Sequence, residues 1–206
     1  MIKISDQSYL VKGAIKTQAD ELLTEIDRII SSSPLRQMQT KRGHYVGAKM
    51  TNCGEWGWVS DKKGYRYSRL DPLTNQAWPA MPTMFKALAM ELASSVGFDH
   101  FQPDVCLINQ YIPKVGMGLH QDKDEHDLSQ PIVSLSLGVP AIFQFGGFKR
   151  SDQVNYHLLQ HGDVVIWGGI DRLRFHGIQP LKLGHHPQTG QTRFNLTFRD
   201  TGNIID

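Results

Sequence analysis

Two histidines and four carboxylates fall within nine positions in the segment L-H-Q-D-K-D-E-H-D, residues 119–127. Residues two apart in an extended strand point to the same face, so we expect His120 and Asp122 to face one side together. Two histidines and one carboxylate on one face leave three coordination positions open, as in non-haem Fe(II) oxygenases. A histidine and an aspartate at this spacing also occur often by chance, so a solvated acidic turn is the alternative.

Other metals fit the segment less well. A calcium loop beginning at Asp122 would need glycine at its sixth position and glutamate at its twelfth, where the chain has Asp127 and Val133. The H-E-x-x-H pattern of zinc proteases is absent from the sequence. Three histidines further along are candidates for a third ligand, and spacing does not choose among them: His157, His161 and His176.

The segment T-R-F-N-L-T-F-R-D, residues 192–200, alternates apolar and polar side chains as a strand does. Its polar face carries Arg193, Asn195, Thr197 and Arg199. Turning two guanidiniums inward is costly unless an anion meets them, and paired guanidiniums suit a dicarboxylate. Asn109 and Tyr111 share one face of another such run and would add hydrogen bonds. A solvated face whose arginines pair with surface acids is the alternative, but beside the metal-ligand pattern we favour the anion site.

Between Arg36 and Arg69, both included, the chain carries eight basic residues against two acids. The same stretch contains five aromatic residues: Tyr45, Trp56, Trp58, Tyr65 and Tyr67. Basic charge interleaved with aromatic rings is typical of a surface that neutralises phosphates and stacks on bases. Taken alone, the stretch fits a solvated basic face with packing aromatics equally well.

Helices and strands must position these residues. Apolar residues at helical spacing predict a helix over residues 17–31, in which Thr17 and Asp20 form a capping box, and a second helix over about residues 82–97. Glycine and aromatic residues between them indicate hairpins and loops over about residues 40–70. After residue 104, five short runs of strand-like composition predict a sandwich, barrel or jelly roll: V-C-L-I-N-Q-Y-I, P-I-V-S-L-S-L-G, A-I-F-Q-F-G-G, D-V-V-I-W-G-G and T-R-F-N-L-T-F-R-D.

Composition narrows the class of protein further. A hydrophobic content of 40%, a charged content of 20% and a net charge of +2 are typical of a soluble globular protein. The sequence has no long apolar run and no signal-peptide pattern, and Cys53 and Cys106 form no disulfide framework. We therefore expect a cytoplasmic protein with no membrane partner, folded as one domain over residues 1–206.

Five motifs stand out after residue 104: N-Q-Y-I-P-K-V-G-M-G-L-H-Q-D-K-D-E-H-D, P-I-V-S-L-S-L-G-V-P-A-I-F-Q-F-G-G-F-K-R, H-G-D-V-V-I-W-G-G, R-F-H-G-I-Q-P-L-K and R-F-N-L-T-F-R-D. The front half adds M-T-N-C-G-E-W-G-W, G-Y-R-Y-S and A-W-P-A-M-P. Together these motifs give a close resemblance to the AlkB family of Fe(II)/2-oxoglutarate-dependent nucleic-acid dealkylases, which covers about residues 35–200. It implies a mainly β fold with flanking helices: a double-stranded β-helix, or jelly roll, over about residues 101–206. Helices and a nucleotide-recognition lid would occupy about residues 1–100.

The resemblance also implies roles for individual residues. The iron ligands would be His120, Asp122 and His176. The 2-oxoglutarate contacts would be Arg193, clamping the far carboxylate, with Asn109, Tyr111, Asn195 and Arg199 assisting. The substrate contacts would be Met50, Thr51, Trp58, Tyr65, Lys123, Asp124 and Arg150.

The implied activity is oxidative removal of N-alkyl groups from bases such as 1-methyladenine and 3-methylcytosine. It would use Fe(II), O2 and 2-oxoglutarate and release aldehyde, succinate and CO2. The expected partner is alkylated DNA, single-stranded or duplex with a flipped base, with RNA as a further candidate and no obligate protein partner. The alternatives are a 2-oxoglutarate hydroxylase of proteins or small molecules, which would not need the basic and aromatic stretch, and a non-catalytic jelly-roll binding module, which would not need the converging polar groups.

Overall fold

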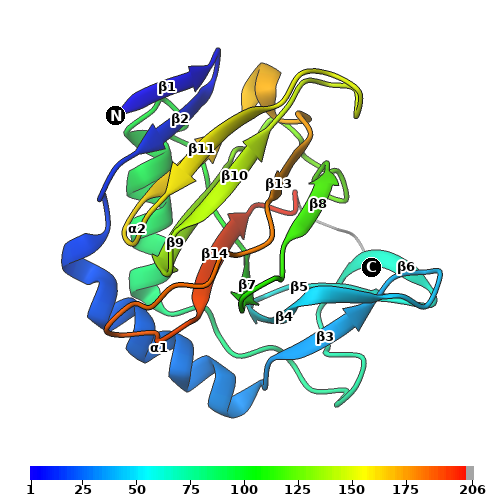
Figure 1. The fold of residues 1–206 in the computed structure, drawn as a ribbon. Coiled ribbons are helices and arrows are strands. Elements are labelled where there is room, and N and C mark those ends of the chain that lie inside the picture. Colours follow the sequence, from blue (N-terminus) through cyan, green and yellow to red (C-terminus); the bar gives the residue numbers. More distant parts are fainter. Residues whose placement is uncertain (203–206) are drawn as a thin grey trace.

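The computed structural model describes residues 1–202, which form two facing antiparallel sheets (Figure 1). The major sheet contains, in spatial order, β1 (Ile2–Ser5), β2 (Ser8–Val11), β12 (Val164–Trp167), β9 (Ile132–Gly138), β14 (Arg193–Arg199), β7 (Val105–Tyr111), β4 (Tyr45–Gly54) and β3 (Arg36–Gln39). The minor sheet contains β11 (Asn155–Leu159), β10 (Ala141–Phe145), β13 (His176–Ile178) and β8 (Met117–His120). The predicted mainly β, jelly-roll architecture is confirmed, and all five strand-like runs form strands.

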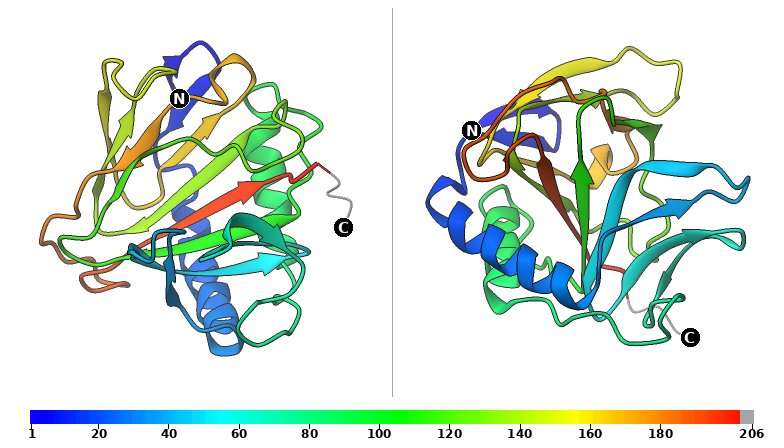
Figure 2. Two further views of the ribbon diagram at one scale, coloured as in Figure 1. Left: turned by 90° about the vertical axis from the view of Figure 1, so that its right-hand side faces the viewer. Right: turned by 60° about the horizontal axis from the view of Figure 1, so that its bottom comes forward.

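Two helices cover the outer face of the major sheet (Figure 2). A short 3-10 turn, η1 (Lys16–Gln18), leads into α1 (Ala19–Ser32), and α2 is formed by Thr83–Ser94. Both predicted helices are confirmed with shifted boundaries, but the predicted capping box is wrong. Because the 3-10 turn precedes the helix, Gln18 takes the N-cap position and the Thr17 hydroxyl donates to the Gln18 side chain. Neither helix is long and apolar enough to cross a bilayer, and the same holds for every other helix within residues 1–202.

The major sheet has an apolar outer face and a mixed inner face. Leu196 and Phe198 of β14 pack outward against the helices, where they meet Leu22 and Phe85. The polar residues of the same strand line the space between the sheets, as strand alternation predicts. The inner face of the major sheet therefore carries the buried polar side chains that can form a functional site.

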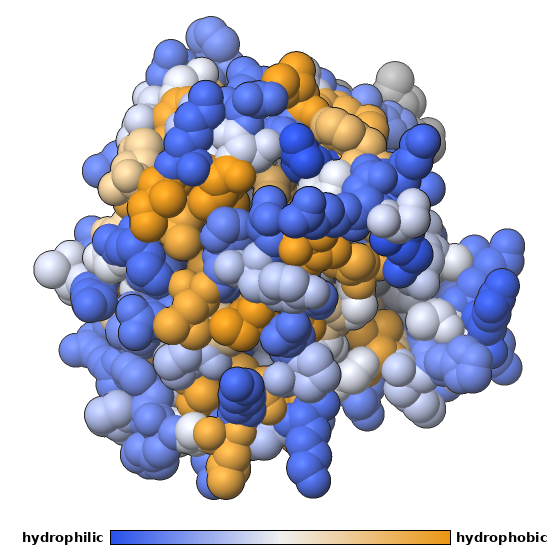
Figure 3. All heavy atoms as spheres, turned by 45° about the horizontal axis from the view of Figure 1, so that its top comes forward, coloured by the Kyte–Doolittle hydropathy of each residue, from blue (hydrophilic) through white to orange (hydrophobic). Residues whose placement is uncertain are grey.

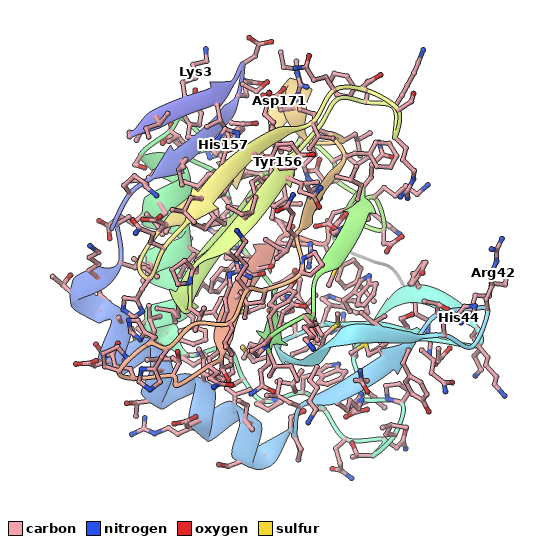
Figure 4. All side chains as sticks on the ribbon, in the orientation of Figure 1. Lys3, Arg42, His44, Tyr156, His157 and Asp171 are labelled. Carbon is pink, nitrogen blue, oxygen red and sulfur yellow. The ribbon has the colours of Figure 1, made fainter. Side chains whose placement is uncertain are left out.

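A separate hairpin, β5 (Gly57–Asp61) with β6 (Gly64–Ser68), lies beside the β3–β4 end of the major sheet (Figure 1). We refer to residues 36–68, from β3 to β6, as the lid. It is continuous with the core because β4 pairs with β7 from Lys49↔Gln110 to Gly54↔Val105. The lid hairpins project from one side of the molecule, and Arg42 and His44 lie at the tip of β3–β4 (Figure 4).

The N-terminal hairpin β1–β2 extends the other edge of the major sheet by pairing with β12. These strands were not predicted from the sequence, because runs of four residues show little alternation. Tertiary contacts hold them: the Ser5 and Ser8 hydroxyls and the Gln7 backbone N–H donate to the buried Asp171 carboxylate. Asp171 closes the 3-10 turn η2 (Gly169–Asp171) shortly before β13.

Candidate metal centre and its cavity

Three metal-ligating side chains converge between β8 and β13. His176 and His120 are paired across these strands, and Asp122 follows β8. Their ligand atoms all lie within 4.8 Å of one another, and this is the one such group of three within residues 1–202. Asp122 Oδ1 is 3.5 Å from His120 Nε2, and Asp122 Oδ2 is 3.7 Å from His176 Nε2. The cluster has the donor set of a two-histidine, one-carboxylate iron site.

Strand alternation is only part of the reason that Asp122 faces the histidines. β8 ends at His120, so Asp122 lies in an irregular segment that no sheet ladder holds. The Arg172 guanidinium instead fixes this segment by donating from Nη1 to the Asp122 backbone carbonyl at 2.6 Å. His120 and Asp122 therefore face the same site for two reasons: the strand positions His120, and Arg172 holds the segment that carries Asp122.

Both imidazoles are oriented by backbone carbonyls. His120 Nδ1 lies 2.9 Å from the Gly118 carbonyl oxygen, and His176 Nδ1 lies 3.1 Å from that of Arg174. With the proton on Nδ1, each Nε2 presents its lone pair to the cluster, which is the tautomer a metal requires. Burial, with the neighbouring His176, lowers the pKa of His120 to about 4, so that its imidazole is neutral at pH 7.

A guanidinium keeps Asp122 ionised. Arg199 donates to Asp122 Oδ2 from Nη2 at 2.6 Å and from Nε at 3.1 Å. Burial alone would raise the pKa of Asp122, but the positive charge of Arg199 holds it well below the ordinary value. The carboxylate is thus a charged ligand that has been removed from water without being neutralised.

Arg193 is the most conspicuous polar group in the cavity, with 1% of its surface exposed. Its Nη2 donates to Ser136 Oγ at 2.9 Å, and its guanidinium lies 5.1 Å from the centre of the Tyr111 ring. Its Nε and Nη1 have no hydrogen-bond partner among the described residues. A buried cation with two idle donors beside a cavity is the arrangement expected of an anion site.

Amides and hydroxyls occupy the same inner face beside Arg193. Asn195 donates to Ser134 Oγ at 2.8 Å and accepts from Thr197 Oγ1 at 2.9 Å, which fixes its amide. Asn109, its partner across β7 and β14, leaves Oδ1 without a hydrogen-bond partner within the described part of the chain. The arginines do not lie on a solvated face, so the alternative of pairing with surface acids is wrong.

The lid closes the opposite wall of the cavity with aromatic rings. Trp58 and Tyr65 stack with ring centres 5.6 Å apart and an interplanar angle of 16°. Trp58 Nε1 donates to Asp124 Oδ2 at 3.0 Å, which joins the lid to the segment after β8. The cavity encloses about 530 Å³, room for a small dicarboxylate and a nucleobase together.

All but one of the predicted site residues line this cavity. The exception is Thr51, which is fully buried and donates to Ser33 Oγ at 2.9 Å. Successive residues of a strand face opposite ways, so Met50 points into the cavity and Thr51 points toward α1. On this geometry Thr51 is not positioned to contact a ligand in the cavity.

Some lining residues were not predicted. Ser134 lines the cavity and accepts a hydrogen bond from Asn195, while the buried Ser136 accepts one from Arg193. Their spacing of two within P-I-V-S-L-S-L-G was a usable signal. Thr40 and Phe175 also line the cavity, but they lie in connecting segments whose sequence carries no such pattern.

The other two candidate histidines lie elsewhere. His161 stacks on His186 with ring centres 4.2 Å apart, and its Nδ1 accepts from the Gly138 N–H. His157, which is labelled in Figure 4, lies on β11, an edge strand of the minor sheet. Only His176 belongs to the three-residue cluster.

Comparisons with known proteins agree with this geometry. Residues 7–199 match the family model of the 2OG-Fe(II) oxygenase superfamily. The chain is 55% identical over 184 residues to the alpha-ketoglutarate-dependent dioxygenase AlkB of Escherichia coli K12, covering 89% of this chain and 85% of that protein. It is 34% identical over 104 residues to the mouse nucleic acid dioxygenase ALKBH1, covering 50% of this chain and 26% of that protein.

A solved structure extends the likeness to the whole fold. The structure of OsALKBH1 superposes with a TM-score of 0.85 at 25% sequence identity, covering 97% of this chain and 100% of that chain. The family match, the bacterial relative and the His-Asp-His cluster all indicate one enzyme class. The chain is therefore a member of the AlkB family of Fe(II)- and 2-oxoglutarate-dependent dioxygenases.

Proposed function

We propose that this protein removes alkyl groups from the ring nitrogens of nucleobases in DNA by oxidation. The observation that carries the proposal is one cavity with two different walls. One wall holds the metal-ligating triad and the buried Arg193, two of whose donors have no partner among the described residues. The other wall holds the stacked aromatic rings of the lid. The first wall serves the oxidative chemistry, and the second suits a planar base.

The donor groups fit Fe(II) and 2-oxoglutarate. His120, Asp122 and His176 would hold the metal, which keeps positions for the co-substrate and O2. Arg193 would take the far carboxylate with its idle Nε and Nη1, beside Tyr111. Arg199 already donates to Asp122, so its remaining Nη1 is the unpaired donor left to assist near the metal. Asn109 Nδ2 reaches Asn195 Oδ1 only at 3.4 Å and is a further donor on the same face.

When bound, iron with O2 and 2-oxoglutarate supplies the oxidation that converts the N-alkyl carbon to an aldehyde and the co-substrate to succinate and CO2. The protein supplies orientation. The backbone carbonyls of Gly118 and Arg174 keep both Nε2 atoms facing the cluster. Arg193 sets the direction of the co-substrate, and the lid excludes water from the reacting atoms.

The lid wall favours an alkylated base as the substrate. Trp58 would stack on the base while His120 forms the facing wall, and Met50 and Tyr65 would border it. Methylation at the pairing edge leaves 1-methyladenine and 3-methylcytosine positively charged, which strengthens contact with aromatic faces and with the Asp124 carboxylate. Such lesions also pair poorly, so flipping them from a duplex costs less than flipping an intact base.

Positive charge around the mouth of the cavity would contact phosphates. Lys123 and Arg150 line the cavity on the core side. Lys62 and Lys63 are exposed at the turn of the β5–β6 hairpin. On the face drawn in Figure 3, hydrophobic side chains form separate groups among hydrophilic ones. Contacts to phosphate make binding depend on salt without selecting a sequence, as repair of scattered lesions requires.

A hydroxylase of proteins or small molecules would have the same metal ligands and co-substrate site. It would not need the aromatic and basic lid, so the lid favours a nucleic-acid substrate. The test is incubation with Fe(II), 2-oxoglutarate, O2 and an oligonucleotide that carries one 1-methyladenine. Mass spectrometry is expected to show the loss of one methylene and the release of one formaldehyde. Turnover of 2-oxoglutarate with an unchanged oligonucleotide mass would rule out the proposed substrate and leave the oxygenase assignment standing.

We also propose that the enzyme works in the cytoplasm. Cys53 and Cys106 are cross-strand partners in β4 and β7, yet both are free and buried. Neighbouring thiols that stay unbridged are typical of a reducing compartment.

A further inference from the structure

The metal-ligating carboxylate belongs to a cluster of four buried charges. Two are acids and two are guanidiniums: Asp122, Glu125, Arg172 and Arg199. The Arg172 and Glu125 side chains are 3% and 1% exposed, so neither charge is compensated by water. Buried charges of this kind persist only when each is held by a partner.

Asp122 and Arg199 line the cavity, whereas Glu125 lies outside its lining. Its Oε2 lies 3.0 Å from Arg172 Nη2, and its Oε1 lies 3.3 Å from Arg199 Nε. Arg199 in turn holds Asp122, and Arg172 holds the Asp122 backbone carbonyl. Glu125 therefore contacts both guanidiniums that position the metal-ligating carboxylate.

The lid reaches this cluster through one hydroxyl. Tyr67 of β6 donates to Glu125 Oε1 at 2.6 Å. Burial, reinforced by the charge of Glu125, raises the pKa of the Tyr67 phenol, so the hydroxyl stays protonated and remains a donor. Tyr67 is also the cross-strand partner of Trp58, whose indole N–H donates to Asp124. The neighbouring carboxylates of Asp124 and Glu125 thus accept hydrogen bonds from two lid side chains that are themselves cross-strand neighbours.

We propose that Glu125 and Tyr67 form a mechanical link between the lid and the metal centre. Glu125 is a positioning residue that aligns Arg199 on Asp122, and the Tyr67 hydroxyl transmits the position of the β5–β6 hairpin to that alignment. Ordering the metal and co-substrate stabilises the closed lid, and by reciprocity a base held at Trp58 tightens co-substrate binding. The effect of a bound base on co-substrate affinity rests on the proposed function. The effect of metal and co-substrate on the lid does not.

Tyr67→Phe is the sharpest test because it removes one hydroxyl and keeps the ring that packs on Trp56 and Val105. Tyr156→Phe is the matched control. Tyr156 is 58% exposed on β11, away from the lid, as Figures 1 and 4 show. Glu125→Gln is a second variant, which keeps the shape of the side chain and removes its charge.

The first measurement needs no nucleic acid. Amide hydrogen exchange is followed in residues 57–68 with and without Mn(II) plus 2-oxoglutarate, in the absence of O2. The wild type and Tyr156→Phe are expected to slow at least about threefold on ligand addition, whereas Tyr67→Phe and Glu125→Gln lose this slowing. Equal slowing in Tyr67→Phe and the wild type would overturn the link. So would a wild type whose lid does not respond at all.

The second measurement tests the reciprocal effect. Calorimetry gives the affinity for 2-oxoglutarate, with Mn(II), in the presence and absence of a trinucleotide carrying 3-methylcytosine. The wild-type affinity is expected to rise at least about fivefold with the trinucleotide, and the rise is lost in Tyr67→Phe while its affinity without trinucleotide stays within about twofold of wild type. A loss of affinity that is equal in both conditions would show that Tyr67 is only structural.

The two measurements keep two failures apart. If the trinucleotide does not bind but lid exchange still depends on Tyr67, the proposed substrate is wrong and the link stands. If the trinucleotide binds and is demethylated while both responses are unchanged in Tyr67→Phe, the link is wrong and the proposed function stands.

Discussion

The two walls of the cavity are built by different means. The metal wall comes from paired strands of both sheets, and its chemical groups are held by one another: Arg199 holds Asp122, and Ser136 holds Arg193. The lid wall comes from hairpins at the sheet margin, where Tyr65 is 53% exposed. A buried site can fix charges at distances of about 3 Å, because no water competes with its contacts. An exposed wall has to adapt, because a polymer must enter there.

This comparison predicts unequal effects of substitution on the two walls. Changes in the metal wall should abolish chemistry and cost stability. Changes in the lid should weaken nucleic-acid binding and leave metal and co-substrate affinities intact when no nucleic acid is present.

Asp122→Ala is expected to abolish aldehyde release and to weaken Mn(II) binding by more than about 100-fold, since loss even of residues that support metal ligands costs about 10- to 100-fold. The variant also leaves Arg199 buried with only its 3.3 Å contact to Glu125, which should cost about 1–3 kcal/mol of stability. Mn(II) titration by electron paramagnetic resonance and thermal unfolding measure the two effects. Asp127→Ala, in the same segment but outside the cluster, should retain the metal. Wild-type turnover by Asp122→Ala would refute the triad.

Arg193→Lys keeps the charge and removes the planar fork of donors. The dissociation constant for 2-oxoglutarate is expected to rise about 30-fold, because truncating one partner of a buried charged pair costs about 2 kcal/mol or more. Mn(II) affinity without co-substrate is the internal control and should not change. An unaltered affinity for 2-oxoglutarate would mean that the idle donors of Arg193 serve another anion.

Trp58→Ala tests the lid wall by itself. Binding of a methylated oligonucleotide should weaken about tenfold, since stacking on an aromatic side chain is worth about 1–3 kcal/mol per base. Fluorescence anisotropy of a labelled oligonucleotide measures the loss. The affinity for 2-oxoglutarate in the absence of nucleic acid should stay within about twofold. Equal losses of both ligands would break the division between the walls.

The double variant Lys62→Ala, Lys63→Ala is expected to have the smallest effect. Each phosphate contact that is lost should reduce the slope of log affinity against log salt by about 0.7 for a single strand. Binding at high salt and turnover at saturating oligonucleotide should be nearly unchanged. A salt slope identical to that of the wild type would remove the tip of the β5–β6 hairpin from the phosphate-binding surface.

The metal wall was more predictable from sequence than the lid wall. Alternation in β14 placed Arg193 and Asn195 together on the inner face, because a period of two is a local property of the chain. The same rule excludes Thr51 from the cavity that Met50 lines. As neighbours in β4 they face opposite ways, so both could not line one cavity.

Contacts between distant segments left no local signal. The pairing of His176 with His120, across more than fifty residues, was open among three histidines until resemblance to a family selected one. The anchoring of the N-terminal hairpin by Asp171 joins residues more than 160 positions apart. The sequence indicated neither the Tyr67–Glu125 hydrogen bond nor the partners of Arg172.

The kinds of chemistry available to this protein can be read from its sequence: a histidine and a carboxylate at strand spacing, inward arginines on β14, and a basic stretch rich in aromatic rings. These follow from side-chain type and from periodicity, which act over a few residues. Packing of the sheets brings His176 beside His120, pairs Arg199 with Asp122 while two donors of Arg193 stay unpaired, and places Tyr67 of the lid against Glu125. Such choices depend on which segments become neighbours and lose water together, and that is settled only when the sheets pack.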